Sequence, residues 1–167
     1  MGKTQENLKA AFAGESQANR KYLAFAKKAE EEGFEQVAKV FRAAADAETV
    51  HALNHLRTMD GIKSTAENLK EAITGETYEF NEMYPKMISD AEEEGEAAAK
   101  IVFQGANEAE KQHAELYKKA LESIEQETDL EKKEIFVCQV CGHTVENEAP
   151  EECPVCKTKK ENFKKIE

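Results

Sequence analysis

Two sets of glutamates and histidines with nearly the same spacing recur in the two halves of this sequence of 167 residues. The first set is Gly14-Glu15 with Glu48-x-x-His51, and the second is Gly75-Glu76 with Glu110-x-x-His113. The interval from His51 to His113 is one residue longer than that from Glu15 to Glu76, so the second half repeats the first with one extra residue. Residues three apart on a helix share a face, so each Glu-x-x-His pair can bind one ion or two adjacent ions. The repeat therefore predicts a pseudo-twofold site for two metal ions.

The type of metal follows from the ligands. Glu79, three residues after Glu76, adds a fifth carboxylate to the two imidazoles. Such a group buried in one core without cations would cost several kcal/mol for each charge. Oxygen-rich ligands with one histidine per metal favour iron or manganese over zinc. The alternative is chance spacing on solvated helices of a glutamate-rich chain, but the matching register of the two sets favours the metal site.

The four cysteines form two further motifs, Cys138-x-x-Cys141 and Cys153-x-x-Cys156. Two such pairs place four thiolates around a single tetrahedral metal. Zinc would make this module a structural ribbon, whereas iron would make it a one-electron carrier. The spacing does not choose between them. A redox-active pair of metals elsewhere in the chain would need electrons, and this need favours iron.

The elements that position these residues are mainly helical. From residue 4 to 127 the apolar residues recur at helical spacing, which predicts four helices over 4–32, 34–60, 66–94 and 96–127. Gly33 and Gly95 are candidate C-caps at matching positions of the two halves. Four helices around an apolar core predict an all-α four-helix bundle, whose facing helices build metal sites. Pro85 predicts a kink in the third helix, either as a tolerated irregularity or as a device that shapes the site near Glu79.

The C-terminal part has a different pattern. Residues 134–137 read as a strand, and the cysteines follow among Gly142, Pro150 and Pro154. A segment of this size needs a metal to stabilise it, because its own core is too small. The sequence therefore predicts two domains, 1–130 and 131–167, with a linker over 128–134.

Composition excludes several classes of protein. The net charge of -11 argues against binding to a nucleic-acid backbone. No run of about 18 apolar residues predicts a membrane span, and the N-terminus has no apolar stretch typical of a secretory signal. Cysteines used in Cys-x-x-Cys pairs fit a reducing compartment, so we expect a cytoplasmic protein.

The order of these motifs resembles rubrerythrins over nearly the whole chain. Ferritins and many di-iron oxygenases share the carboxylate helices, but Glu79 together with a rubredoxin-like tail is typical of rubrerythrins. The resemblance implies a ferritin-like bundle with two non-haem irons and a small rubredoxin-like β domain with one iron, for which zinc could substitute. It assigns the metal ligands to Glu15, Glu48, His51, Glu76, Glu79, Glu110, His113, Cys138, Cys141, Cys153 and Cys156.

The resemblance also implies a role for each ligand of the di-iron site. Glu48 and Glu110 would bridge the irons or bind beside them. Glu15 and Glu76 would be terminal ligands, and His113 would hold the second iron.

Four residues are the candidates for catalytic roles. The resemblance implies that the first iron moves between Glu79 in the oxidised state and His51 in the reduced state. Tyr22 and Tyr84 each lie about two turns after a Gly-Glu pair. From spacing alone, each tyrosine could either hydrogen-bond an iron-bound carboxylate or pack in the core.

The expected function is that of a peroxidase in oxidative-stress defence, which reduces hydrogen peroxide to water. Its electrons would come from rubredoxin or from an NAD(P)H-dependent reductase, through the four-thiolate iron. The resemblance implies a head-to-tail homodimer or a larger homo-oligomer, in which the rubredoxin-like domain of one chain serves its partner. Two alternatives are a ferroxidase that handles iron and a structural adaptor built on a zinc ribbon.

Overall fold

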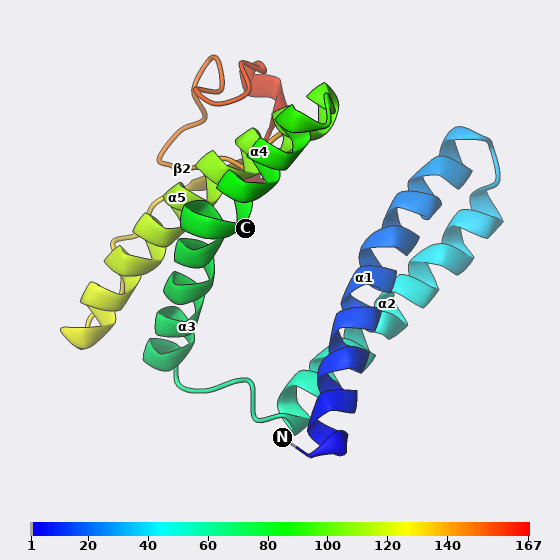
Figure 1. Ribbon diagram of the computed structural model, residues 1–167, viewed down its shortest axis with the longest axis horizontal. Coiled ribbons are helices and arrows are strands. Elements are labelled where there is room, and N and C mark those ends of the chain that lie inside the picture. The colour runs from blue at the N-terminus through cyan, green and yellow to red at the C-terminus, as the bar shows by residue number, and fades with distance from the viewer. Residues whose placement is uncertain (1) are drawn as a thin grey trace. The chain divides into compact units, whose positions relative to one another are not determined.

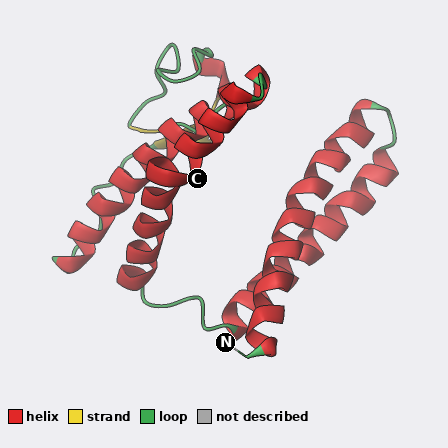
Figure 2. Cartoon of the chain, viewed as in Figure 1, coloured by secondary structure: helices red, strands yellow, loops and turns green. Residues whose placement is uncertain are grey.

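The computed structural model describes residues 2–167, which are mostly helical with a small strand module at the C-terminus (Figures 1 and 2). The chain divides into two compact units, with the boundary between Lys63 and Ser64. The first unit is a helical hairpin, and the second contains the remaining helices and the strand module. The mostly helical architecture with a C-terminal strand module agrees with the sequence prediction. No described helix combines the length and the apolar character that crossing a membrane would require.

The first unit consists of α1 (Lys3–Glu31) and α2 (Glu35–Thr58). The buried positions of α2 are alanines at a constant heptad interval, namely Ala38, Ala45 and Ala52. Small side chains at this interval let two helices pack closely along one seam.

Gly33 ends α1 as the sequence predicts. Its φ of +82° is a left-handed conformation that glycine adopts without a steric penalty. The amide of Phe34 donates to the carbonyl of Ala29 at 2.8 Å, and the amide of Gly33 donates to the carbonyl of Glu30 at 3.0 Å. These bonds close the last turn of the helix. Gly95, with a φ of +74°, makes the corresponding turn in the second unit.

The helices of the second unit are α3 (Thr65–Tyr78), α4 (Tyr84–Glu93) and α5 (Ala97–Glu125). A capping box of Ser64 and Glu67 begins α3. Between α3 and α4 lies η1 (Glu79–Met83), a π-helix. The single helix predicted over 66–94 is therefore interrupted in its middle, and Pro85 falls in the first turn of α4, a position that proline tolerates.

The π-helix accounts for the extra residue of the second half. The interval from Tyr22 to Tyr84 already contains that residue, whereas the interval from Glu15 to Glu76 does not. The additional residue therefore lies between Glu76 and Tyr84. A π-helical turn holds more residues than an α-helical turn, so it absorbs one insertion while the helix continues. Glu79 is the first residue of this turn.

The strand module is a three-stranded antiparallel sheet of order β2-β1-β3. Its elements are β1 (Ile135–Cys138), β2 (Thr144–Glu146), the short 3-10 helix η2 (Lys160–Asn162) and β3 (Phe163–Ile166). Phe136 pairs with Val145 on one side and with Lys165 on the other. The largest fully buried side chains of the described chain are those of Cys138 and Cys153. The module is thus built around its cysteines rather than around large apolar residues.

The strand module packs against α5 within the second unit. A Cβ atom placed on Gly105 of α5 would lie 3.2 Å from the Cβ of Cys141, and one placed on Gly142 would lie 3.7 Å from the Cβ of Ala109. Lys119 of α5 forms an ion pair of 3.2 Å with Glu146 of β2. The module therefore shares a compact unit with α3, α4 and α5. The division of the chain at residue 130 stays a prediction.

Candidate metal centres

The first unit brings together the first set of predicted ligands, which we name the α1–α2 site. Glu15 comes from α1, and Glu48 and His51 come from α2. One potential ligand atom from each of these residues lies within 4.8 Å of the others. The Nδ1 atom of His51 is 2.8 Å from Oε2 of Glu48, and the His51 side chain is 54% exposed.

Asn19 fixes the two helices beside the α1–α2 site. Its side chain is buried, and its amide donates to the carbonyl of Ala45 at 2.7 Å and to the hydroxyl of Thr49 at 2.8 Å. Sequence reasoning missed this residue. The available signal was an asparagine one turn after Glu15, because asparagine is unfavourable inside a helix unless its side chain has a hydrogen-bonding role.

Tyr22 lies in an aromatic cluster of the first unit. Its ring centroid is 6.3 Å from those of both Phe25 and Phe41. Within the described part of the chain, no hydrogen bond from Tyr22 to Glu15 is present. The contacts of Tyr22 are thus those of core packing, and its predicted catalytic role stays a prediction.

The second unit brings together the second set, which we name the α3–α5 site. Glu76 comes from α3, and Glu110 and His113 come from α5, again with ligand atoms within 4.8 Å of one another. The Nδ1 atom of His113 is 2.7 Å from Oε2 of Glu110 and 3.9 Å from Oε1 of Glu76.

Glu76 of the α3–α5 site and the nearby Glu79 lie in surroundings that raise the pKa of each carboxyl group. Burial raises the pKa of Glu76 to about 7, with further contributions from a hydrogen bond to Glu110 and from the negative charge of Glu110. Burial also raises the pKa of Glu79, and the charge of Glu110 adds to that effect. Glu79 therefore lies within electrostatic reach of the site, although it is not one of the three clustered ligands. A cation bound among these groups would remove the mutual repulsion.

Two tyrosines also lie within electrostatic reach of the α3–α5 site. Burial raises the pKa of Tyr84, followed by the negative charges of Glu110, Glu79 and Glu76. Burial and the charges of Glu76 and Glu110 likewise raise the pKa of Tyr117. Sequence reasoning selected Tyr84 but missed Tyr117. The signal was its position one helical turn after His113, on the same face of α5.

The second ring nitrogen of His113 is held by the strand module. Nε2 of His113 is 3.0 Å from the hydroxyl of Thr144, which donates its one proton to the carbonyl of Gly142 at 3.1 Å. Nε2 must then be the protonated nitrogen, and the lone pair of Nδ1 faces the Glu110 carboxylate. With Nδ1 unprotonated, His113 and the Glu110 carboxylate face each other as two acceptors, and their close contact requires a cation or a proton between them. The arrangement fits a histidine that binds a metal through Nδ1 while its other nitrogen is held by a hydrogen bond.

The four cysteines form a separate cluster in the strand module. The Sγ atoms of Cys138 and Cys156 are 3.6 Å apart, and those of Cys141 and Cys153 are 3.7 Å apart. A disulfide needs about 2.05 Å, so the thiols are not paired. A tetrahedron with metal–sulfur bonds of about 2.3 Å has edges of about 3.8 Å, which fits the observed separations.

Hydrogen bonds from backbone amides stabilise the thiolate forms of Cys138 and Cys141. Burial acts to raise the pKa of Cys138, but amide hydrogen bonds from Cys141 and Val140 outweigh it, so the pKa is lowered. Burial raises the pKa of Cys141, although the amide of His143 opposes the rise. A divalent or trivalent metal would stabilise all four thiolates.

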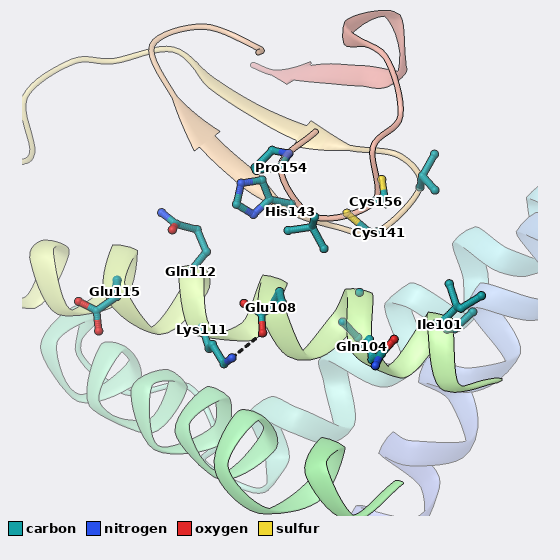
Figure 3. Close-up of a pocket in the computed structure, with 15 residues that line it drawn as sticks. Ile101, Gln104, Glu108, Lys111, Gln112, Glu115, Cys141, His143, Pro154 and Cys156 are labelled. Carbon is teal, nitrogen blue, oxygen red and sulfur yellow. Dashed lines mark hydrogen bonds and ion pairs between the residues drawn. The ribbon is translucent and has the colours of Figure 1, made fainter. Parts of the chain in front are cut away.

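A groove separates the cysteine cluster from the N-terminal part of α5 (Figure 3). It has a volume of about 850 Å³, and its lining includes Cys141, Cys156 and Pro154 on one side and Ile101 and Val102 of α5 on the other. Figure 3 shows Cys141 and Cys156 on the edge of the module that faces the helix.

Comparisons with known proteins match both parts of the chain. Residues 6–121 match the Rubrerythrin family, and residues 136–164 match the rubredoxin-like domain of rubrerythrin. Nigerythrin of Nitratidesulfovibrio vulgaris is 38% identical, over 98% of this chain and 86% of its own length. Rubrerythrin-2 of Clostridium acetobutylicum is 33% identical, over 96% of this chain and 95% of its own length.

Solved structures of nigerythrin in mixed-valence and fully reduced, all-ferrous states are similar to this chain, with a TM-score of 0.57 and 38% identity. The matches cover 99% of this chain and 88% of nigerythrin. They confirm the predicted ferritin-like and rubredoxin-like fold class. The donor sets fit the predicted cofactors, which are a di-iron carboxylate site and an iron bound by four thiolates. The chain belongs to the rubrerythrin family.

Proposed function

We propose that this protein is a peroxidase that uses two protons and two electrons to reduce one hydrogen peroxide molecule to two water molecules. The family assignment makes it a di-iron oxidoreductase of oxidative-stress defence. The observation that carries the finer proposal is Glu79. It stands on a π-helix, where burial and the charge of Glu110 raise its pKa, and π-helical turns occur frequently at functional sites.

The two sites would supply the ligands for the iron pair. Glu15, Glu48 and His51 would bind from the first unit, and Glu76, Glu110 and His113 from the second. Two ferrous ions supply Lewis acidity and one electron each when bound. Glu79 and His51 are the ligands that we propose to exchange between oxidation states.

The protons would come from groups that hold them near neutral pH. Glu76 retains a proton up to about pH 7 in the metal-free site, because burial raises its pKa to about 7. Metal binding displaces that proton, so Tyr84 is the better donor in the loaded site. Its raised pKa keeps the phenol neutral, and a neutral phenol can donate.

The electrons would come from the four-cysteine module, one at a time. Nigerythrin has been solved in mixed-valence, partially reduced and all-ferrous states, and similar changes of oxidation state are what we propose here. A reduced rubredoxin or an NAD(P)H-dependent reductase would in turn reduce the module. The four unpaired thiols suit a reducing compartment, so we propose a cytoplasmic location. We also propose a homo-oligomer, and its head-to-tail arrangement stays a prediction.

An anaerobic single turnover tests the proposed activity. The iron-loaded protein is reduced and mixed with one equivalent of hydrogen peroxide, while the absorption of the thiolate-bound iron and the remaining peroxide are followed. We expect peroxide to disappear and the oxidised spectrum to return. A protein that instead oxidises added Fe(II) and retains an iron core would be a ferroxidase. A colourless module that holds zinc, with no loss of peroxide, would indicate the structural adaptor.

A further inference from the structure

We infer that a cavity beside His113 binds the alkyl group of compact, uncharged organic hydroperoxides, so that these compounds are substrates as well as hydrogen peroxide. This inference rests on the proposed function and extends it to a second class of peroxide. The O–O bond of the hydroperoxide breaks, and two protons and two electrons convert its two oxygens into one alcohol and one water molecule. The electrons are the same two that the proposed function takes from the ferrous pair.

The cavity belongs to the second unit, and we name it the Leu116 cavity. Its volume is about 390 Å³, which falls in the range of about 300–1,000 Å³ that is usual for small-molecule sites. Most of the lining is apolar. The apolar residues are Leu69 of α3, Leu116 and Ala120 of α5, Leu130 of the segment before β1, and Ile135 of β1. The polar residues are His113, Tyr117, Lys119, Thr144 and Glu146.

Two residues connect the Leu116 cavity with the α3–α5 site. His113 lines the cavity, and its Nδ1 atom is 2.7 Å from Oε2 of Glu110. Tyr117 lines the cavity one turn further along α5, and the charges of Glu76 and Glu110 act on its phenol. An alkyl group bound in the cavity would therefore lie beside a proposed metal ligand. A substrate with an apolar body and a short polar end has to be held in such a position.

The outer part of the Leu116 cavity reaches the surface. Leu130 is 46% exposed and Ile135 is 39% exposed, so a small ligand has access from solvent. In the same lining, Lys119 forms an ion pair of 3.2 Å with Glu146, so this lysine is already neutralised. The chain as a whole has a net charge of -11, which repels anionic ligands. The cavity therefore favours an uncharged apolar ligand over a hydroperoxide that carries a carboxylate.

The repeat in the sequence distinguishes this lining from a general property of the helices. At the interval that separates His51 from His113, the residues of α2 that correspond to Leu116, Tyr117 and Ala120 are Asn54, His55 and Thr58. The apolar positions thus belong to the second half only. Protein interiors are normally close-packed, so apolar side chains that face a cavity lack part of their packing contacts. An alkyl group in the cavity would supply those contacts and would leave water.

The first test measures binding without turnover. The zinc-loaded full chain is titrated with tert-butanol, the alcohol that tert-butyl hydroperoxide would yield, and NMR records NOEs from its methyl groups to the protein. We expect NOEs to Leu69 and Leu116, and a Kd at least about tenfold weaker in Ala120→Phe, which narrows the cavity. Ala98→Phe, the same change at an exposed position of α5, is the matched control and should bind as the wild type does. Absence of NOEs to both leucines would overturn the site.

A second variant keeps this test independent of the packing of α5. Leu130 lies outside the helices and strands and is 46% exposed, so Leu130→Trp should fold as the wild type does. Its larger side chain should occupy the outer part of the Leu116 cavity and weaken tert-butanol binding in the same sense. Circular dichroism and zinc content check that each variant is intact. Wild-type binding in both Ala120→Phe and Leu130→Trp would overturn the site.

The second test compares two peroxides in the anaerobic single turnover of the iron-loaded protein. We expect tert-butyl hydroperoxide to be consumed with formation of one equivalent of tert-butanol. In Ala120→Phe and Leu130→Trp its rate constant should fall at least about tenfold, whereas that of hydrogen peroxide should stay within about twofold of the wild type. Consumption of hydrogen peroxide alone, or equal losses for both peroxides in both variants, would overturn the inference. Failure of both peroxides in the wild type would contradict the proposed function and the substrate role together, and the NOEs would still decide whether the cavity binds an apolar ligand.

Discussion

The α1–α2 site and the α3–α5 site each have two glutamates and one histidine, but the contacts of their histidines differ. His51 is 54% exposed and contacts Glu48 through Nδ1, and among residues 2–167 its Nε2 atom has no hydrogen-bond partner. His113 is 28% exposed and is held at both nitrogens, by Glu110 and by Thr144. The two sites therefore differ in the exposure and the hydrogen bonding of their histidines, although their ligands are of the same types. A histidine fixed at both ends suits a permanent ligand, whereas one held at a single end can exchange.

The helices that carry Glu15 and Glu76 also differ between the two halves. In α1 the chain is regular from Lys3 to Glu31, whereas the equivalent stretch of the second half contains the π-helix Glu79–Met83. Ala18 stands three residues after Glu15, in the place that Glu79 takes after Glu76. The fifth carboxylate thus belongs to one half only, and it lies where the extra residue widens the helix. The exchange that we propose between Glu79 and His51 would use this asymmetry.

The largest expected effect comes from removing that fifth carboxylate. Glu79→Ala should lower the rate of peroxide consumption by about 100-fold or more, because in the proposed mechanism the oxidised iron would lose its exchanging ligand. The single-turnover assay measures the rate, and metal analysis checks that iron content is kept. The matched control is Glu82→Ala, an exposed glutamate of the same π-helix, which should keep the wild-type rate. Equal losses in both variants would contradict a specific role for Glu79.

A smaller effect is expected from making the two halves equally long. Deletion of Asn81 should turn η1 into a regular α-helix and leave α4 in register, because a π-helical turn absorbs one residue. Circular dichroism should show unchanged helix content, while peroxide turnover falls about tenfold as the Glu79 carboxylate is redirected. Wild-type peroxide turnover in a variant whose NMR spectra show a regular helix would contradict a role of the π-helix in the activity.

The α3–α5 site should also make the stability of the metal-free protein depend on pH. The pKa of Glu76 is about 7 in the folded protein and 4.5 when unperturbed. Between these values the folded state keeps a proton that the unfolded state has released, so stability falls as pH rises from about 4.5 to about 7. Glu76→Gln mimics the protonated form.

The Gln variant should therefore gain thermal stability relative to the wild type progressively over that pH range. Parallel melting curves of the two metal-free proteins measure the difference. In the wild type, metal must displace the same proton, so cobalt affinity should fall by up to about tenfold per pH unit below about pH 7 from this group. A stability difference that stays constant with pH would contradict the raised pKa.

The smallest effect tests whether the scaffolds of the two halves are equivalent even though their sites are not. Gly33→Ala and Gly95→Ala each place a side chain at a positive φ, of +82° and +74°. Each should lower the free energy of unfolding by about 1–2 kcal/mol, as measured by urea denaturation. Peroxide turnover should not change in either variant. Markedly different costs would show that the two turns do not play the same structural role.

Much of this architecture could be predicted from local sequence patterns. The glycine C-caps follow from the backbone conformation that a helix end requires, so Gly33 and Gly95 were found at the right positions. The ligand spacings reflect helical periodicity, so the sequence indicated that Glu48 lies beside His51 and that Glu110 lies beside His113. The cysteine cluster was predictable because two Cys-x-x-Cys knuckles have few other uses.

The missed features depend on contacts between distant segments or on subtle register. The connection between His113 and Thr144 joins two segments far apart in the sequence, and nothing in either local sequence indicates it. From the sequence alone, Gly105 is an unfavourable residue inside a helix. The structure explains it by the close approach of Cys141. The spacing of the repeat places one extra residue between Glu76 and Tyr84, but it does not show that this residue forms a π-helix. Within its own unit, neither Gly14 nor Gly75 has a heavy atom of the described chain within 4 Å of an added Cβ.

The most direct test of the asymmetry between the two sites is a pair of crystal structures of the iron-loaded protein, one oxidised and one fully reduced. We predict that His113 binds iron through Nδ1 in both, with Nε2 on Thr144. His51 should bind only in the reduced protein, and Glu79 should bind only in the oxidised protein. Two histidines that behave alike in both states, either always bound or both exchanging, would contradict the asymmetry.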